Sequence, residues 1–122
     1  MNTIKIFIGS NGKEPSEMEQ LFEGKFDAKA IEFVHGNDKF KRNCNYFLYV
    51  FTPTTEGIKT IINVVNDSNR FKSKVIFLVL NEADEFTPHQ VKSLIATGKM
   101  VELNGGKWFD KLETMIEFLE NK

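Results

Sequence analysis

Two uninterrupted apolar stretches constrain the fold of this 122-residue chain more than any other feature. Residues 46–51 read Tyr-Phe-Leu-Tyr-Val-Phe, and residues 75–80 read Val-Ile-Phe-Leu-Val-Leu. A strand with one face in water alternates polar and apolar residues, and neither stretch does so. Burial on both faces is typical of parallel strands in a sheet covered by helices on both sides. We therefore predict that both stretches are central strands.

The rest of the chain alternates strand and helix patterns around these two stretches. Further strands are expected at residues 4–8, 28–34 and 99–103, the last as a weak edge strand. Helices are expected at residues 16–24, 57–67 and 87–98, where the first begins with a capping box and the last with Thr-Pro. After the turn at residues 104–106 we expect a closing helix that carries Trp108, Leu112, Met115, Ile116 and Leu119.

Five strands alternating with helices predict a doubly wound α/β fold of the flavodoxin-like kind. The expected sheet is five-stranded and parallel, in the order 2-1-3-4-5, with helices on both faces. No internal repeat, low-complexity segment or linker interrupts the pattern. Residues 1–122 are therefore expected to form a single domain.

Composition narrows the setting of the protein. Sixteen basic and seventeen acidic residues leave a net charge of −1, which gives no global attraction to nucleic acid or to an anionic membrane. The one cysteine, Cys44, cannot form an internal disulfide, and no signal peptide or membrane-spanning run is evident, so a cytoplasmic location is expected. The two histidines, His35 and His89, have no partners at ligand spacing, and neither a metal nor a cofactor is expected.

The architecture also predicts where a ligand binds. In open α/β sheets, ligands lie beyond the carboxyl ends of the strands, where the strand order reverses. In a 2-1-3-4-5 order this point lies between strands one and three, whose following loops are rich in small polar residues. Such residues bind sugar or phosphate oxygens through N–H and hydroxyl groups, and they also simply make strand-to-helix turns. The candidate binding residues are Gly9, Ser10, Asn11, Gly12, Thr52, Thr54, Thr55 and Gly57.

Several stretches carry a resemblance to a known family. Residues 5–10 (Lys-Ile-Phe-Ile-Gly-Ser) resemble the opening strand and glycine turn of the nucleoside 2-deoxyribosyltransferases. A longer similarity to the compact branch of that family runs from Cys44 through Thr-Pro at 52–53 and Glu-Gly at 56–57 to residues 64–69 and 74–77. Positions 86, 89–90, 92–94 and 98–99 continue it. The resemblance implies binding of a nucleoside or nucleotide, chemistry at its N-glycosidic bond, and a homo-oligomer, most simply a dimer, in which a neighbouring subunit helps to complete the site.

That chemistry requires two carboxyl groups. A retaining transfer needs a carboxylate nucleophile, and the departing base needs an acid to protonate it. The resemblance places the nucleophile at Asn63, six residues past Gly57, and the acid at Asn45. Both residues are amides, which supply neither an anionic oxygen nor an acidic proton. We therefore expect weak or absent transferase activity.

Other residues leave alternatives open. Glu56 is a candidate acid, and it also suits a helix start through complementation of the helix dipole. Asp38 is a second candidate, whereas Asp84 and Glu85 are expected to be solvated turn residues. Three functions remain: a nucleoside-binding protein with little activity, an active deoxyribosyltransferase or nucleoside hydrolase that uses displaced acids such as Glu56, and a protein-interaction module.

Overall fold

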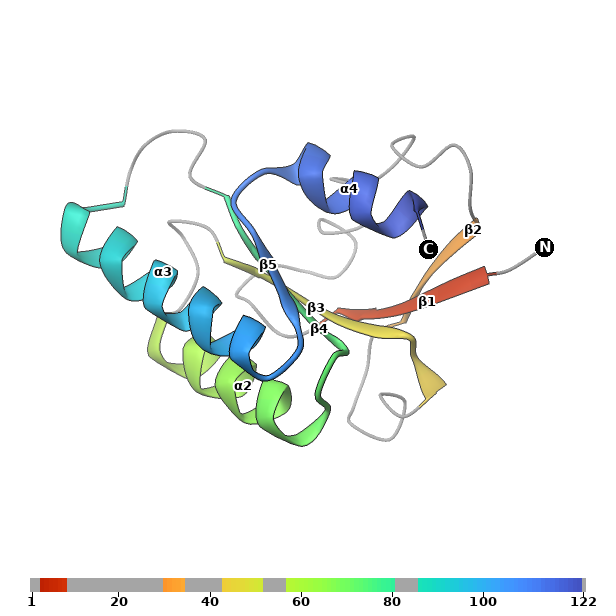
Figure 1. The fold of residues 1–122 in the computed structure, drawn as a ribbon, viewed down its shortest axis with the longest axis horizontal. Helices are drawn as coiled ribbons and strands as arrows, with labels where there is room; N and C mark the ends of the chain where they lie inside the picture. Colours follow the sequence, from red (N-terminus) through yellow and green to blue (C-terminus); the bar gives the residue numbers. More distant parts are fainter. Residues whose placement is uncertain (1–2, 9–29, 35–42, 52–56, 81–85, 122) are drawn as a thin grey trace.

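The chain forms one sheet with helices on both faces, as seen in a computed structural model that describes residues 3–8, 30–34, 43–51, 57–80 and 86–121 (Figure 1). The described strands are β1 (Thr3–Ile8), β2 (Ala30–Val34), β3 (Tyr46–Phe51), β4 (Val75–Val79) and β5 (Lys107–Phe109). The described helices are α2 (Gly57–Arg70), α3 (Pro88–Leu103) and α4 (Leu112–Glu120).

The five strands are all parallel and follow the order β2-β1-β3-β4-β5. This is the predicted flavodoxin-like order, and it places the reversal of strand order between β1 and β3. The register sets Ile6 of β1 beside Tyr46 of β3, and Phe47 beside Val75 of β4. The predictions that β3 and β4 are interior strands are both confirmed.

Two separate cores lie on the two faces of the sheet. On one face Phe47, Tyr49 and Phe77 pack under α2 and α3, together with Val64 and Leu94 from these helices. The opposite face is aliphatic, and α4 covers it through two buried side chains. Its central members are Leu48, Val50, Ile76, Leu78, Met115 and Leu119. Figure 1 shows α4 on one side of the sheet and α2 with α3 on the other. Because both faces are buried, polar residues do not alternate with apolar residues along β3 and β4.

Helix α3 starts as the sequence predicts and ends later than it predicts. The Thr87 hydroxyl accepts from the Gln90 N–H, and the Gln90 side chain accepts from the Thr87 N–H, which completes a capping box. The helix then runs through Gly98 to Leu103. The prediction of a strand at residues 99–103 was therefore wrong. Gly98 does not end the helix. A glycine is needed there because a side chain would collide with Trp108, whose Cδ2 would lie 2.4 Å from an added Cβ.

The fifth strand is β5, which lies beyond the turn at residues 104–106. Gly105 adopts a φ of +91°, a conformation that favours glycine, and it follows the α3 C-cap residue Asn104. Trp108 was predicted on the closing helix and instead lies in β5, beside Phe77 of β4. The closing helix, α4, begins four residues later at Leu112. The helix predicted at residues 16–24 lies outside the described residues.

Candidate functional site

Three of the predicted site residues are described: Asn45, Gly57 and Asn63. Gly57 is the first residue of α2, so it lies at the carboxyl edge of the sheet beside the end of β3. The remaining predicted residues lie outside the described residues: Gly9, Ser10, Asn11, Gly12, Thr52, Thr54, Thr55 and Glu56.

Asn45 lies at the amino edge of the sheet, immediately before β3. Its Oδ1 accepts the Lys5 N–H at 2.8 Å, and its own N–H donates to the Lys5 carbonyl oxygen at 2.8 Å. The side chain thus joins the start of β3 to β1. At a rise of about 3.3 Å per residue, Asn45 is roughly 20 Å from the far end of β3. The structure therefore does not bring Asn45 to the carboxyl edge of the sheet, where the binding site was predicted.

Asn63 lies in the middle of α2 and is half-buried. Six residues separate it from Gly57, so it lies about 9 Å along the helix from the carboxyl edge. The next residue, Val64, is fully buried against the sheet. Asn63 is thus closer to the predicted ligand edge than Asn45 is, and the two amides belong to different ends of the fold.

The buried carboxylate of α2 is Asp67, which sequence reasoning missed. Its side chain is 4% exposed and accepts a hydrogen bond from the hydroxyl of Tyr49, itself buried in β3. Asp67 follows Asn63 by four residues, so both lie on neighbouring parts of one helix face. A signal was present, because Asp67 falls three residues after Val64 on the buried stripe of α2. It lies deep beneath β3 rather than at the carboxyl edge.

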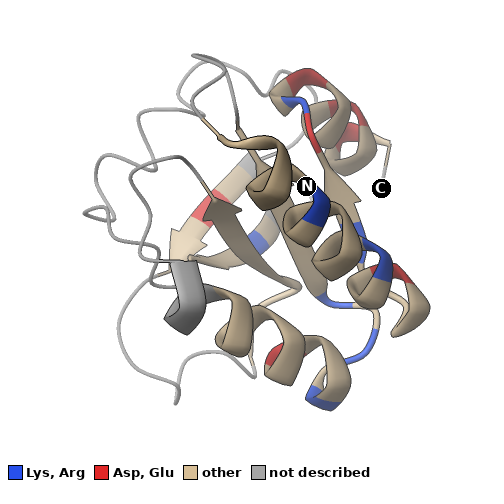
Figure 2. Ribbon diagram, turned by 90° about the vertical axis from the view of Figure 1, so that its left-hand side faces the viewer, with Lys and Arg blue, Asp and Glu red and all other residues tan. Residues whose placement is uncertain are grey.

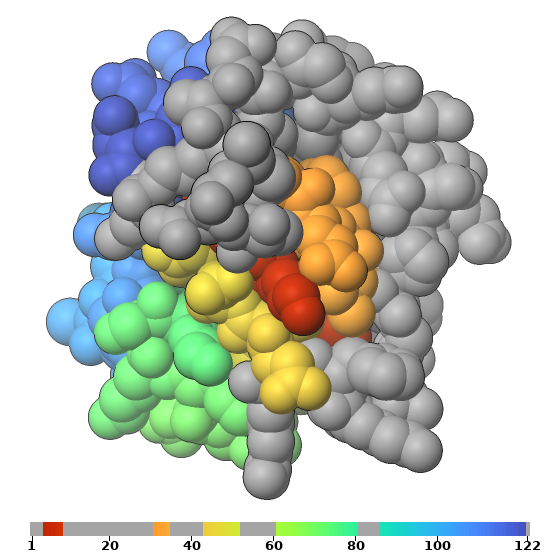
Figure 3. Space-filling view, turned by 90° about the vertical axis from the view of Figure 1, so that its right-hand side faces the viewer, coloured from red at the N-terminus to blue at the C-terminus, as the bar shows by residue number. Residues whose placement is uncertain are grey.

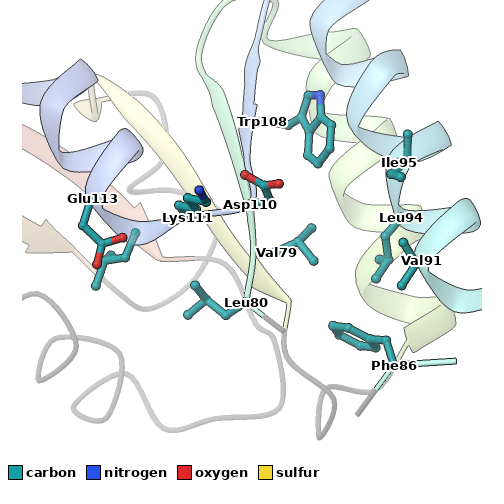
Figure 4. Close-up of a pocket in the computed structure, with 11 residues that line it drawn as sticks. Val79, Leu80, Phe86, Val91, Leu94, Ile95, Trp108, Asp110, Lys111 and Glu113 are labelled. Carbon is teal, nitrogen blue, oxygen red and sulfur yellow. The ribbon is translucent and has the colours of Figure 1, made fainter. Parts of the chain in front are cut away.

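A cavity of about 520 Å³ lies at the carboxyl ends of β4 and β5, between α3 and the start of α4 (Figure 4). Val79, Leu80 and Phe86 line it where β4 ends, and Val91, Leu94 and Ile95 line it from α3. Trp108 of β5 contributes an aromatic wall. Its indole N–H donates to Glu102 at 3.1 Å, so hydrogen bonding and the contact with Gly98 both position the ring.

Charged side chains form one rim of this cavity. Asp110, Lys111 and Glu113 come from the turn between β5 and α4 and from the first turn of α4, and all three are exposed. Lys111 is the N-cap residue of α4, and its side chain makes no capping hydrogen bond. In Figure 4 Asp110 lies between Lys111 and Trp108, whereas Glu113 lies farther from Trp108. The cavity therefore combines an apolar interior with two acidic groups and one basic group at its mouth.

The cavity lies on the edge of the sheet where ligands bind in such folds, but not at the reversal of strand order. The reversal lies between β1 and β3, whereas the cavity lies at β4 and β5, farther along the sheet. Sequence reasoning missed this cavity because it assigned Trp108 to a helix and ended α3 at Gly98. The available signal was the apolar pair Val91 and Ile95, of which Ile95 remains 37% exposed.

Electrostatics at the amino edge centre on the buried thiol of Cys44. Burial raises its pKa, Lys5 and Lys74 oppose the rise, and Glu32 adds to it. The Lys74 ammonium also donates to the Cys44 carbonyl oxygen at 3.4 Å. A protonated thiol is a poor nucleophile, so this environment suits packing rather than catalysis.

Comparison of the chain with models of protein families, with curated proteins and with solved structures finds no significant match. Within the described ranges, no group of three His, Cys, Asp or Glu side chains is arranged to hold a metal ion. None of the described helices is both long and apolar enough to cross a membrane. The ribbon in Figure 2 shows basic and acidic residues interspersed along the described helices.

Proposed function

We propose that this protein binds a nucleoside or nucleotide at the carboxyl edge of the sheet, between β1 and β3, with little or no deoxyribosyl transfer. The observation that carries the proposal is the strand order β2-β1-β3-β4-β5. It places β1 and β3 side by side at the reversal of strand order. The amino-acid sequence continues from the ends of these two strands with the glycines, serine and threonines suited to sugar and phosphate oxygens.

The absence of carboxylates at the two matched positions supports binding without turnover. Asn63, on α2, has no anionic oxygen to attack an anomeric carbon. Asn45 is engaged with the Lys5 backbone at the amino edge. Loss of a covalent nucleophile typically removes several orders of magnitude in rate, which leaves only binding and positioning. The protein would then act as a sensor, a sequestering agent or a regulatory partner.

The proposal includes a setting and an assembly. The single cysteine, Cys44, cannot form an internal disulfide, which supports a cytoplasmic location. The family resemblance and the small size of the domain support a dimer that completes the ligand site. Light scattering at working concentration tests the assembly, and a monomeric mass with unchanged ligand affinity would contradict it.

The decisive experiment measures binding and base exchange side by side. Calorimetry with deoxynucleosides and their 5′-monophosphates should detect binding, while a mixture with a second free base should yield no exchanged nucleoside. Asn63→Glu should raise exchange, because it returns a carboxylate to the helix near the ligand. Asn45→Asp is the matched control, and we expect it to change exchange little because residue 45 lies at the other edge. Robust exchange by the unmodified protein, abolished by Glu56→Gln, would overturn the proposal in favour of an active enzyme.

A further inference from the structure

We propose that the cavity between α3, β5 and the start of α4 is a second ligand site, which takes a small zwitterion with an apolar body, such as a hydrophobic α-amino acid. The proposal does not depend on nucleoside binding. The nucleoside edge lies between β1 and β3, whereas this cavity lies at β4 and β5.

The size and lining of the cavity suit a small apolar body. Its volume of about 520 Å³ falls within the roughly 300–1,000 Å³ of typical small-molecule pockets. Phe86 and Leu94, which are 8% and 4% exposed, form a floor that the core already holds in place. Val91 and Trp108 are half-buried walls, so part of their apolar surface is still open to a ligand. Removal of that surface from water favours an aromatic or branched aliphatic occupant.

The mouth of the cavity determines the polar end of the ligand. Asp110 and Lys111 are adjacent, opposite in charge and exposed, and within the described part of the chain neither side chain forms a hydrogen bond or an ion pair. The uncapped first turn of α4 adds partial positive charge on the side of Lys111. Glu113, in that same turn, offsets part of it and lies away from Trp108 (Figure 4).

Charge complementarity then selects a zwitterion over a simple ion. A ligand with only an ammonium group would be attracted by Asp110 and repelled by Lys111. A ligand with only a carboxylate would be attracted by Lys111 and repelled by Asp110. A ligand that carries both groups on one carbon places an ammonium toward Asp110 and a carboxylate toward Lys111 and the α4 N-terminus. Its side chain is then directed between Val91, Leu94 and Trp108.

The chain contains a built-in probe for this site, because Trp108 is its only tryptophan. Trp108 fluorescence would be followed while L-phenylalanine is added, with phenethylamine and 3-phenylpropionate as matched ligands that share the ring but lack one charge. We expect saturable binding of L-phenylalanine, weakened about two- to fivefold for each missing charge. Equal affinity for all three would overturn the zwitterion assignment. No fluorescence change and no calorimetric heat with L-phenylalanine or L-leucine would overturn the site.

Variants distinguish the contribution of the apolar cavity interior to ligand binding from that of the charged groups at its mouth. Asp110→Asn and Lys111→Gln should each weaken L-phenylalanine binding about two- to fivefold, while Glu32→Gln and Lys99→Gln, which alter exposed charges outside the cavity, should not. Val91→Phe should fill the cavity interior and abolish binding without changing nucleoside affinity. Should Val91→Phe fail to fold, the charge variants still decide the matter. Unchanged L-phenylalanine affinity in both Asp110→Asn and Lys111→Gln would contradict the proposal.

Discussion

Tyr49 and Asp67 illustrate how a single buried polar pair fits into an aromatic core. Tyr49 is 2% exposed, lies between Phe47 and Phe51 on β3, and donates its hydroxyl to a carboxylate that is also buried. A buried polar group is tolerated only where hydrogen bonds compensate for its lost hydration. The pair therefore fixes α2 on β3 at a defined position, because sliding the helix would leave the carboxylate without this donor.

Tyr49→Phe should lower the free energy of unfolding by about 1–3 kcal/mol, because it leaves the buried Asp67 carboxyl group without this donor while the same ring fills the space. Urea denaturation followed by circular dichroism measures the change. Tyr46→Phe is the matched control: its ring packs on Phe118, and we expect less than about 0.5 kcal/mol. Equal effects of the two variants would contradict the role given to Asp67.

Helix α3 and strand β5 show which elements local sequence can define and which it cannot. The start of α3 is a local matter, since Thr87, Pro88 and Gln90 set it within one turn, and sequence reasoning found it. Its end is not local. Gly98 is required by a ring ten residues away, and the apolar residues at 99–103 read equally well as a strand. Because residues 99–103 were predicted as a strand, Trp108 was assigned to the closing helix and the cavity was missed. The burial of β3 and β4 on both faces could be predicted from their own residues.

Thr87→Ala tests the capping box at the start of α3. Loss of the hydroxyl that accepts from the Gln90 N–H should cost about 1 kcal/mol of unfolding free energy. Thr114→Ala, at an exposed position of α4, provides the control and should change stability by less than about 0.5 kcal/mol. A similar loss in both variants, measured by urea denaturation, would show that the capping box contributes nothing.

Gly98→Ala tests the long-range contact, and the sign of its effect is informative. In an open helix, replacing glycine by alanine stabilises by about 1 kcal/mol. Here an added Cβ would come within 2.4–2.8 Å of three Trp108 ring atoms, so we expect destabilisation by about 1–3 kcal/mol. In the Trp108→Ala background the same substitution should become stabilising. Additive effects in this double-mutant cycle, measured by chemical denaturation, would refute the packing argument.

At the scale of the whole molecule, the two cores account for the predictable part of the architecture. Each strand residue of β3 and β4 points to one of two layers, an aromatic one under α2 and α3 and an aliphatic one under α4. The uninterrupted apolar stretches therefore revealed the burial of both faces of the sheet, and the alternation of strands with helices predicted the doubly wound fold and its strand order. The proposed nucleoside edge follows from topology, but the β4–β5 cavity depends on how α3, β5 and α4 meet. That meeting is a property of three-dimensional packing that no local stretch encodes.

At alkaline pH, the free energy of unfolding should depend on the ionisation of the Cys44 thiol. Burial holds the pKa of its thiol above the unfolded value, so its contribution to stability is complete below about pH 8.5 and is lost as pH rises through the native pKa. The unfolding free energy of the native sequence should therefore fall relative to Cys44→Ala by up to about 1.4 kcal/mol per pH unit in that range. Denaturation curves at several pH values measure this, and parallel pH profiles for the two proteins would exclude the effect.

The order of the strands in the sheet bears on the tendency of the chain to form fibrils. Segments such as YFLYVF and VIFLV are uncharged and rich in β-formers, which is the composition of self-stacking fibril segments, and both occupy interior positions. The outer strands are β2 and the three-residue β5, and each carries an exposed charge, Glu32 and Lys107 respectively. Figure 3 shows β2, in orange, beside β1. The exposed charge on each outer strand and the short length of β5 disfavour pairing with an incoming strand, so the segments with the strongest tendency to stack lie between strands that pair poorly with other chains.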